Sequence, residues 1–242
     1  MSLSLISSQV PYSCSQYWID RYQTHQFVFD WIETFDSLLP YLTQIFSSFN
    51  RDISSLSLLH IGCGTSELSE KIYNTYNIKS ITNIDASPCA IKFMYERTRQ
   101  YPEMTWLVMD AKSMPFQKEK FDVVIDKCVS DALYCSKHPL NDIAIYYREV
   151  NRVLKNEGVF IVISYQEERI EQLKKSHLCF DVQCVTIENS IEEENGNMLK
   201  KVSYMYICKK KSKCNEEEFN VYLEEVRNKE QRTQEDIDLI SN

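Results

Sequence analysis

The residues best suited to chemistry are a Gly-Cys-Gly turn and three aspartates, each at the end of an apolar run. They are Gly62, Cys63 and Gly64 in the stretch LLHIGCGTSE, then Asp85, Asp110 and Asp126 at the ends of SITNID, TWLVMD and FDVVID. A glycine turn allows positive φ and lets a ligand lie against the backbone. A carboxylate can accept both hydroxyls of a ribose. Together these residues favour a nucleoside site.

Two of the carboxylates have separate roles in this hypothesis. Asp85 would accept the ribose hydroxyls, while Asp110 would accept from an adenine amino group beside the Ala111 N–H. Taken singly, such an aspartate is more often a turn or helix-cap residue. Three acidic strand ends after a glycine turn favour binding. The turn lacks the third glycine of a pyrophosphate site, which disfavours a nicotinamide dehydrogenase.

Apolar strands and helices alternate along the chain and would position these residues. The predicted strands are 56–61, Ser80–Asp85, Thr105–Asp110, Phe121–Asp126 and Gly158–Tyr165, and the predicted helices include Ser66–Tyr76, Pro88–Gln100 and Leu140–Leu154. This alternation predicts a parallel sheet with helices on both faces. Ligands bind such sheets beyond the carboxyl ends of the strands, where the glycine turn and the aspartates would lie.

Two further segments predict a hairpin at the edge of this sheet. Phe180–Glu188 and Leu199–Lys209 alternate between apolar and polar residues, and Asn195-Gly196 between them is a turn signal. A lysine run then gives way to glutamates, which indicates the end of a domain. We expect a flexible N-terminus over residues 1–15, one domain over 16–210, and a charged tail with an amphipathic helix over 211–242.

The segment Gln16–Phe35 is dense in aromatic rings and has two interpretations. It could be a helix that caps the core, which is the commoner role of such residues, or an aromatic lid over a bound ligand. Residues alone leave both open.

Composition narrows the class of protein. A net charge of -8 disfavours a broad nucleic-acid surface. The nine cysteines form no Cys-x-x-Cys pair, so we expect reduced thiols in a cytoplasmic protein and no metal site. Neither a membrane span nor a signal peptide is predicted.

Four motifs resemble a known family. They are Tyr17-Trp18-x-x-Arg21-Tyr22, Gly62-Cys63-Gly64-x-Ser66-x-Leu68-Ser69, Asn83-Ile84-Asp85 and Asp126-Lys127-x-x-x-Asp131-Ala132-Leu133. Over residues 16–165 the chain resembles class I S-adenosylmethionine-dependent methyltransferases, within them the branch that includes lysine methyltransferases of translation elongation factor 1-alpha. The resemblance implies an α/β fold: a Rossmann-like three-layer sandwich with a seven-stranded, mostly parallel sheet and an antiparallel C-terminal hairpin.

The resemblance also implies a cofactor and its site. The cofactor would be S-adenosyl-L-methionine, with S-adenosyl-L-homocysteine as product. Its expected binding residues are Trp18, Tyr22, Trp31, Gly62, Cys63, Gly64, Asp85, Ala86, Asp110, Ala111 and Lys127. The candidate bases for the acceptor amine are Asp126 and Asp131, although Asp131 is equally well explained as a helix N-cap.

The expected activity is methylation of a protein lysine, with elongation factor 1-alpha as the leading substrate and no nucleic-acid or membrane partner. A small-molecule methyltransferase and a non-catalytic cofactor-binding protein are the alternatives, because a fold does not fix a substrate. Two residues depart from the pattern. His60 stands where many class I methyltransferases outside this branch carry an acidic residue. Cys128 replaces the glycine that usually follows the Asp-Lys pair of the branch.

Overall fold

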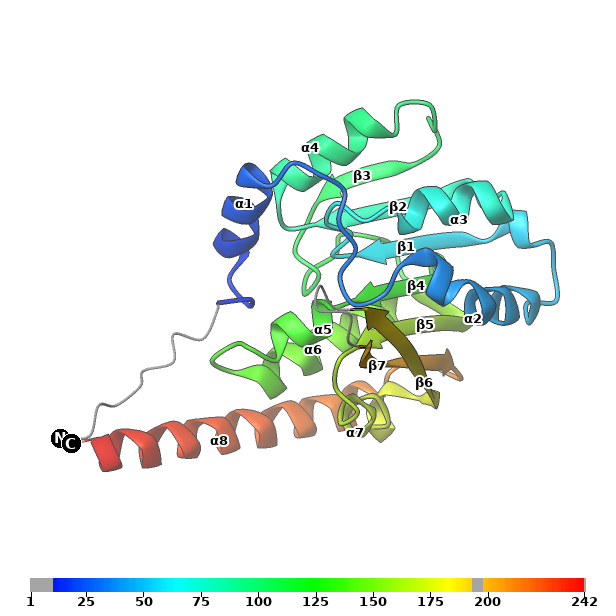
Figure 1. Ribbon diagram of the computed structural model, residues 1–242. Helices are drawn as coiled ribbons and strands as arrows, with labels where there is room; N and C mark the ends of the chain where they lie inside the picture. Colours follow the sequence, from blue (N-terminus) through cyan, green and yellow to red (C-terminus); the bar gives the residue numbers. More distant parts are fainter. Residues whose placement is uncertain (1–10, 193–197, 242) are drawn as a thin grey trace.

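The computed structural model describes residues 11–192 and 198–241 and contains one seven-stranded sheet (Figure 1). Its strands are β1 (Ser57–Ile61), β2 (Ser80–Asp85), β3 (Thr105–Val108), β4 (Phe121–Lys127), β5 (Leu154–Ser164), β6 (Phe180–Glu192) and β7 (Met198–Lys210). The helices are α1 (Ser15–Thr24), α2 (Phe35–Ser47), α3 (Leu68–Tyr76), α4 (Pro88–Arg97), α5 (Val129–Leu133), α6 (Pro139–Val153), α7 (Arg169–Leu173) and α8 (Glu216–Ser241), with short 3-10 turns at Ile53–Ser55 and Ser176–Leu178.

The strand order is β3-β2-β1-β4-β5-β7-β6, and the predicted fold class is confirmed. Strands β1 to β5 pair in parallel, while β7 runs antiparallel to both β5 and β6. The chain builds outward from β1 in one direction through β2 and β3, then returns to place β4 on the other side of β1. The carboxyl ends of β1 and β4 therefore mark the topological switch, where open α/β sheets bind ligands.

Both faces of the sheet are covered, which gives three layers. One face packs against α2 and α3, and its core includes Leu42 and Leu58. The other packs against α6, and its core includes Leu59 and Val150. Neighbouring residues of β1 thus enter opposite cores, and all seven residues of β4 are buried. This two-sided burial is why the inner strands are continuous apolar runs.

The structure refines several element boundaries. Strand β5 begins at Leu154, before the predicted start at Gly158, and β3 ends at Val108, so Asp110 lies in the loop after it. Helix α8 confirms the predicted tail helix, and its buried Phe219 and Val226 pack toward the body. The expected turn at Asn195-Gly196 and residues 1–10 of the expected flexible start lie outside the described residues. The domain boundaries stay predictions.

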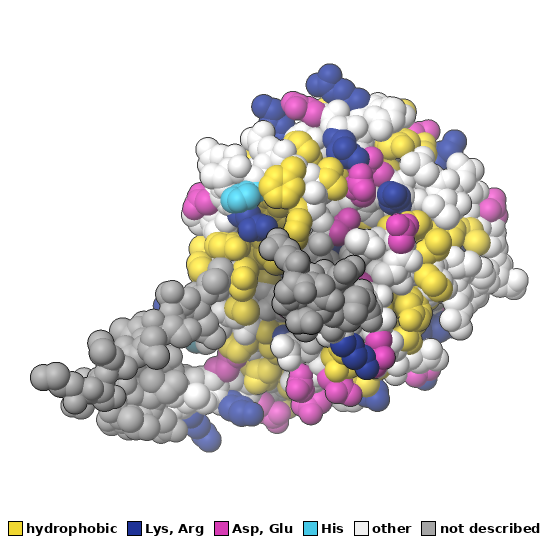
Figure 2. Space-filling view, viewed as in Figure 1, with side chains coloured by type: hydrophobic (Ala, Val, Ile, Leu, Met, Phe, Trp, Pro, Cys, Tyr) yellow, Lys and Arg dark blue, Asp and Glu magenta, His cyan; other side chains and the backbone are white. Residues whose placement is uncertain are grey.

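The N-terminal segment 11–34, called the lid below, crosses the carboxyl end of the sheet before α2. In Figure 2, hydrophobic side chains gather on the part of the surface near α1. The lid contributes two exposed rings, Phe27 at 50% and Phe29 at 39% exposure. Over the residues that the structure describes, no helix is long and apolar enough to cross a bilayer.

Candidate active site

A cavity of about 530 Å³ lies beyond the carboxyl ends of β1, β2 and β4, beneath the lid. Of the expected cofactor residues, it is lined by Trp18, Tyr22, Trp31, Gly62, Asp85, Ala86, Asp110, Ala111 and Lys127. Cys63 and Gly64 are not among the lining residues. The cavity thus brings together residues that are far apart in the sequence, and it has room for a nucleoside with a side chain.

The structure gives a reason for glycine at positions 62 and 64 that does not depend on a ligand. Gly62 and Gly64 have φ values of 59° and 49°, which side chains rarely adopt. A Cβ on Gly62 would collide with the Val129 side chain, and one on Gly64 would collide with the Tyr22 hydroxyl. The two glycines therefore allow α5 and the lid to approach β1. The expected positive φ is confirmed.

Asp85 joins the two loops that border the cavity. Its Oδ2 accepts a hydrogen bond from the Gly64 N–H at 2.8 Å, and its Oδ1 accepts from the Ser87 N–H at 2.8 Å. Burial raises the pKa of this carboxyl, and the two backbone N–H groups oppose that rise. Each oxygen keeps a second lone pair. Asp85 is thus both a turn residue and an acceptor that lines the cavity.

The aromatic residues of the lid form the outer wall of the cavity. The rings of Trp18 and Tyr22 stack with centroids 6.1 Å apart, and Trp31 meets Trp18 edge-on at 5.7 Å. The Arg21 guanidinium lies 4.8 Å from the Trp31 ring centroid. Tyr22 is buried, while Trp18 and Trp31 remain partly exposed toward the cavity. This geometry favours the lid interpretation, although the ring cluster also extends the core.

Lys127 anchors the lid to β4. Its Nζ donates to Asp30 Oδ1 and to the Trp31 carbonyl, both at 3.0 Å, and its side chain is only 3% exposed. Asp30 also accepts from the Ser66 hydroxyl at the glycine turn. Sequence reasoning missed Asp30, because its only signal was its place within an aromatic segment. Asp30 thus fixes the lid both to β4 and to the loop that follows β1.

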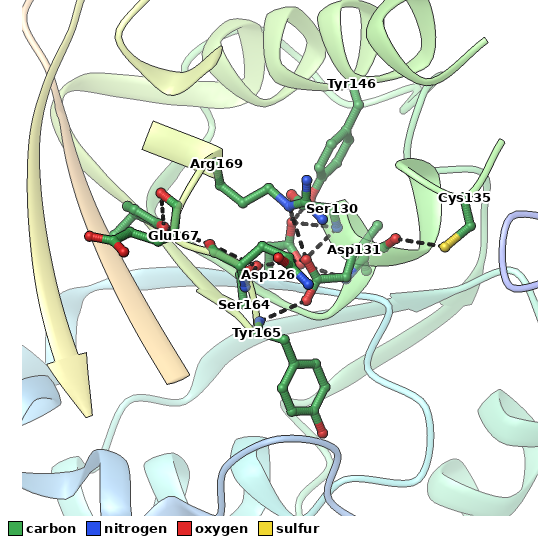
Figure 3. Close-up of polar contacts among 12 residues, drawn as sticks. Asp126, Ser130, Asp131, Cys135, Tyr146, Ser164, Tyr165, Glu167 and Arg169 are labelled. Atoms are coloured by element: carbon green, nitrogen blue, oxygen red, sulfur yellow. Dashed lines mark hydrogen bonds and ion pairs between the residues drawn. The ribbon is translucent and has the colours of Figure 1, made fainter. Parts of the chain in front are cut away.

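The two candidate bases, Asp126 on β4 and Asp131 on α5, are not among the residues that line the cavity (Figure 3). Asp126 is fully buried and accepts hydrogen bonds from the Val129 N–H at 2.7 Å and the Tyr146 hydroxyl at 3.1 Å. Burial raises its pKa to about 6. The helix cap suggested as the alternative for Asp131 is thus made by Asp126.

Both carboxylate oxygens of Asp131 also have partners within the protein. Its Oδ1 accepts from the Ser164 hydroxyl at 2.6 Å and pairs with the Arg169 Nε at 3.0 Å, while its Oδ2 accepts from the Tyr165 N–H at 3.1 Å. A base would have to give up these partners to take a proton. The catalytic role of both aspartates stays a prediction, and the geometry favours a structural role.

Cys128 occupies a position that favours glycine. It lines the cavity with φ of 79°, and αL costs a residue with a side chain about 1–2 kcal/mol. We therefore expect Cys128→Gly to be more stable than Cys128→Ala by about 1 kcal/mol, after allowance for the entropy of glycine in the unfolded chain. Both substitutions remove the thiol, so their difference in urea unfolding isolates the backbone strain. Equal stabilities would contradict this interpretation.

His60 is fully buried on β1, and its Nδ1 lies 3.0 Å from the Ser69 hydroxyl. Burial, assisted by the Lys127 ammonium, lowers its pKa to about 3. An unfolded histidine titrates near pH 6.5, so between these values the unfolded chain binds more protons and stability falls as the pH falls. Between pH 7 and pH 5 we expect His60→Gln to lose about 2 kcal/mol less stability than the wild type. Urea unfolding at both pH values measures this, and equal losses would contradict it.

The comparison with known families agrees with this geometry. A model of the methyltransferase domain matches residues 53–238, most of the chain. The chain belongs to the methyltransferase-domain family. The cavity lies at the switch between β1 and β4, where open α/β sheets bind ligands.

Individual relatives of this methyltransferase-domain chain carry related names. It is 37% identical over 150 residues to an "eEF1A lysine and N-terminal methyltransferase homolog" of Drosophila melanogaster, covering 58% of this chain and 22% of that protein. It is 32% identical over 176 residues to the "eEF1A lysine and N-terminal methyltransferase" of Mus musculus, covering 71% and 24%. The chain therefore spans about a quarter of the length of these relatives. It is also 28% identical over 176 residues to "EEF1A lysine methyltransferase 4" of Bos taurus, covering 65% and 66%.

Solved structures support the fold. A SAM-dependent methyltransferase from Methanosarcina mazei superposes with a TM-score of 0.51 at 15% identity, covering 69% of this chain and 97% of that one. The YcgJ protein from Bacillus subtilis superposes with a TM-score of 0.53 at 14% identity, covering 72% and 99%. The methyltransferase-domain match agrees with S-adenosyl-L-methionine as the expected cofactor.

The residues of the cavity fit such a cofactor. Asp85 and Asp110 are the carboxylates among its lining residues, and the Trp18 and Trp31 rings of the lid line the same cavity. Asp110 is exposed, and its Oδ1 accepts from the Lys112 N–H at 2.8 Å, which leaves its second oxygen open. Acceptors for hydroxyl and amino groups, together with aromatic walls, are what a nucleoside with a cationic sulfonium requires.

Proposed function

We propose that this chain is an S-adenosyl-L-methionine-dependent methyltransferase that methylates a lysine side chain of a protein, with elongation factor 1-alpha as the leading substrate. One observation carries the proposal: a cavity lined by Asp85 and Asp110 and roofed by aromatic rings, at the β1–β4 switch of a methyltransferase-domain chain. The substrate is suggested by the names of the relatives, since the fold alone hosts many acceptors.

Each part of the cavity has a task in this proposal. Asp85 accepts the ribose hydroxyls, and Asp110 with the Ala111 N–H recognises the adenine edge. The lid excludes water and fixes the orientation of the bound molecule, because Lys127 and Asp30 fasten it to β4. When bound, the cofactor supplies an activated methyl group on a sulfonium. The contribution of the chain is then mainly alignment of the acceptor amine.

The acceptor lysine must lose a proton before it reacts. Asp126 and Asp131 are already hydrogen-bonded within the protein and do not line the cavity. Burial lowers the pKa of an amine by disfavouring its charged form. The apolar walls supplied by Cys128, Val129 and Leu133 would therefore promote deprotonation without a dedicated base.

A cytoplasmic location and a protein partner belong to the same proposal. All nine cysteines are free thiols, and Cys63 and Cys208 are buried in the core. Free thiols in this number are typical of a reducing compartment. A protein acceptor is suggested by the exposed rings of the lid, Phe27 and Phe29, because aromatic residues are enriched at protein interfaces.

The experiment incubates the purified chain with isotope-labelled S-adenosyl-L-methionine and purified elongation factor 1-alpha, then maps the label by mass spectrometry. We expect labelled methyl groups on a lysine of the factor, with none when Asp85→Ala replaces the wild type. Label confined to a small-molecule fraction of a cell extract would contradict a protein substrate. Absence of label from every fraction, despite cofactor binding, would contradict an enzyme.

A further inference from the structure

Tyr165 is an exposed ring on a rigidly held segment of backbone. It follows β5 directly, and its side chain is 46% exposed. Its N–H donates to Asp131 Oδ2 at 3.1 Å. Beyond it, the Tyr206 hydroxyl of β7 donates to the Gln166 and Glu167 carbonyls at 2.7 and 2.8 Å. The backbone on either side of the ring is therefore held in place by α5 and β7.

The Asp131 carboxylate is the centre of this support. It holds the Ser164 hydroxyl as well as the Tyr165 N–H, and Arg169 from α7 pairs with it at 3.0 Å (Figure 3). The Arg169 guanidinium in turn lies 3.5 Å from the centroid of the Tyr134 ring. Asp131 therefore ties α5, which borders the cavity, to the segment that carries Tyr165.

The Tyr165 ring points away from this cluster, toward the blue N-terminal part of the chain (Figure 3). Strand β4 pairs with β5 up to Lys127 and Ile163, and the Cys128 N–H donates to the Ile163 carbonyl at 3.1 Å. Tyr165 thus lies beside Cys128, which lines the cavity. The Cys128 thiol, the Glu33 carboxylate and the Ile32 backbone all lie close enough to influence the pKa of the Tyr165 hydroxyl. The ring therefore stands where β4, β5 and the lid meet.

We infer that Tyr165 contacts the acceptor: its ring, beside Cys128, forms a wall of the channel through which a lysine side chain reaches the cavity, and Asp131 is the positioning residue that fixes the ring. This inference rests on the proposed function. A lysine suits such a wall, because its methylene stem packs against an aromatic face and its ammonium is attracted to the ring. Asp131 thereby acts through Tyr165 and does not itself take a proton.

The test uses two probes whose affinities are measured by calorimetry. One is S-adenosyl-L-homocysteine, and the other is a cofactor analogue in which an aminobutyl chain replaces the methyl group and imitates the lysine stem. We expect Tyr165→Ala to weaken the binding of the analogue about tenfold and to leave the affinity for S-adenosyl-L-homocysteine unchanged. Tyr165→Phe should retain the affinity of the wild type. Tyr95→Ala, which removes a 57% exposed ring on α4, is the matched control and should change neither probe.

A double-mutant cycle tests the positioning role of Asp131. Introduced into the wild type, Asp131→Ala should weaken binding of the analogue by at least about threefold. Introduced into Tyr165→Ala, it should weaken binding no further, because the effects of coupled residues are non-additive. Additive losses would overturn the positioning role, and equal analogue affinity in Tyr165→Ala and wild type would overturn the channel. Thermal melting checks that each variant is folded, with Asp131→Asn as the milder substitution. Failure of the wild type to bind S-adenosyl-L-homocysteine would instead refute the proposed function.

Discussion

Replacing Asp85 with alanine should weaken the binding of S-adenosyl-L-homocysteine by about 100-fold or more, because hydrogen bonds to a charged group contribute about 1.5–3 kcal/mol each and a ribose would make two of them. The loss has a second cause. Asp85 also accepts a hydrogen bond from the Gly64 N–H at 2.8 Å, so the substitution also loosens the glycine turn. Calorimetric titration measures the affinity.

The control for Asp85→Ala is Asp181→Ala. Asp181 lies on the hairpin strand β6, and its side chain is 57% exposed beside Lys211. Removing this carboxylate changes the net charge equally but leaves the cavity intact, so its affinity should match that of the wild type. Thermal melting then separates lost binding from lost folding, because Asp85 supports two loops. Unchanged affinity in a folded Asp85→Ala protein would contradict the assignment of the ribose to this residue.

The substitution Gly64→Ala should lower the free energy of unfolding by about 3 kcal/mol, the sum of a side chain at positive φ and overpacking against a neighbour. The neighbour is the Tyr22 hydroxyl, which a Cβ on Gly64 would overlap. The lid would have to move away from the turn, so cofactor affinity should fall as well. Urea unfolding measures the stability change.

The second substitution Tyr22→Phe tests the cause of this loss. It removes the hydroxyl that would collide, so the Gly64→Ala/Tyr22→Phe double variant should regain about 1–2 kcal/mol of the overpacking cost. The cost of positive φ should remain. A double variant no more stable than Gly64→Ala would show that the lid does not press on the turn as described.

The positions of the inner strands along the chain and the edge of the sheet that carries the site were predictable because they depend on local patterns. Buried parallel strands are continuous apolar runs, and β4 with all its residues buried is the clearest case. Gly62 and Asp85 follow such runs directly, so their position at one edge of the sheet follows from the topology alone.

The rest depended on contacts between residues distant in sequence. Asp126 was expected to face the site, but the hydroxyl of Tyr146 and the backbone of α5 surround it. Lys127 was expected at the cofactor, and it lines the cavity, but the partner of its ammonium, Asp30, lies 97 positions away and was not foreseen. Sequence periodicity reports which face of an element is buried, and it carries no information on which partner a buried polar group meets.

The central claim is that the cavity beneath the lid holds the nucleoside of the cofactor. A crystal structure of the chain with S-adenosyl-L-homocysteine tests it most directly. We expect the ribose hydroxyls within hydrogen-bonding distance of Asp85, the adenine beside Asp110 and Ala111, and the lid rings of Trp18 and Trp31 over the ligand. A ligand bound elsewhere on the chain, or no ligand at saturating concentration, would contradict the account.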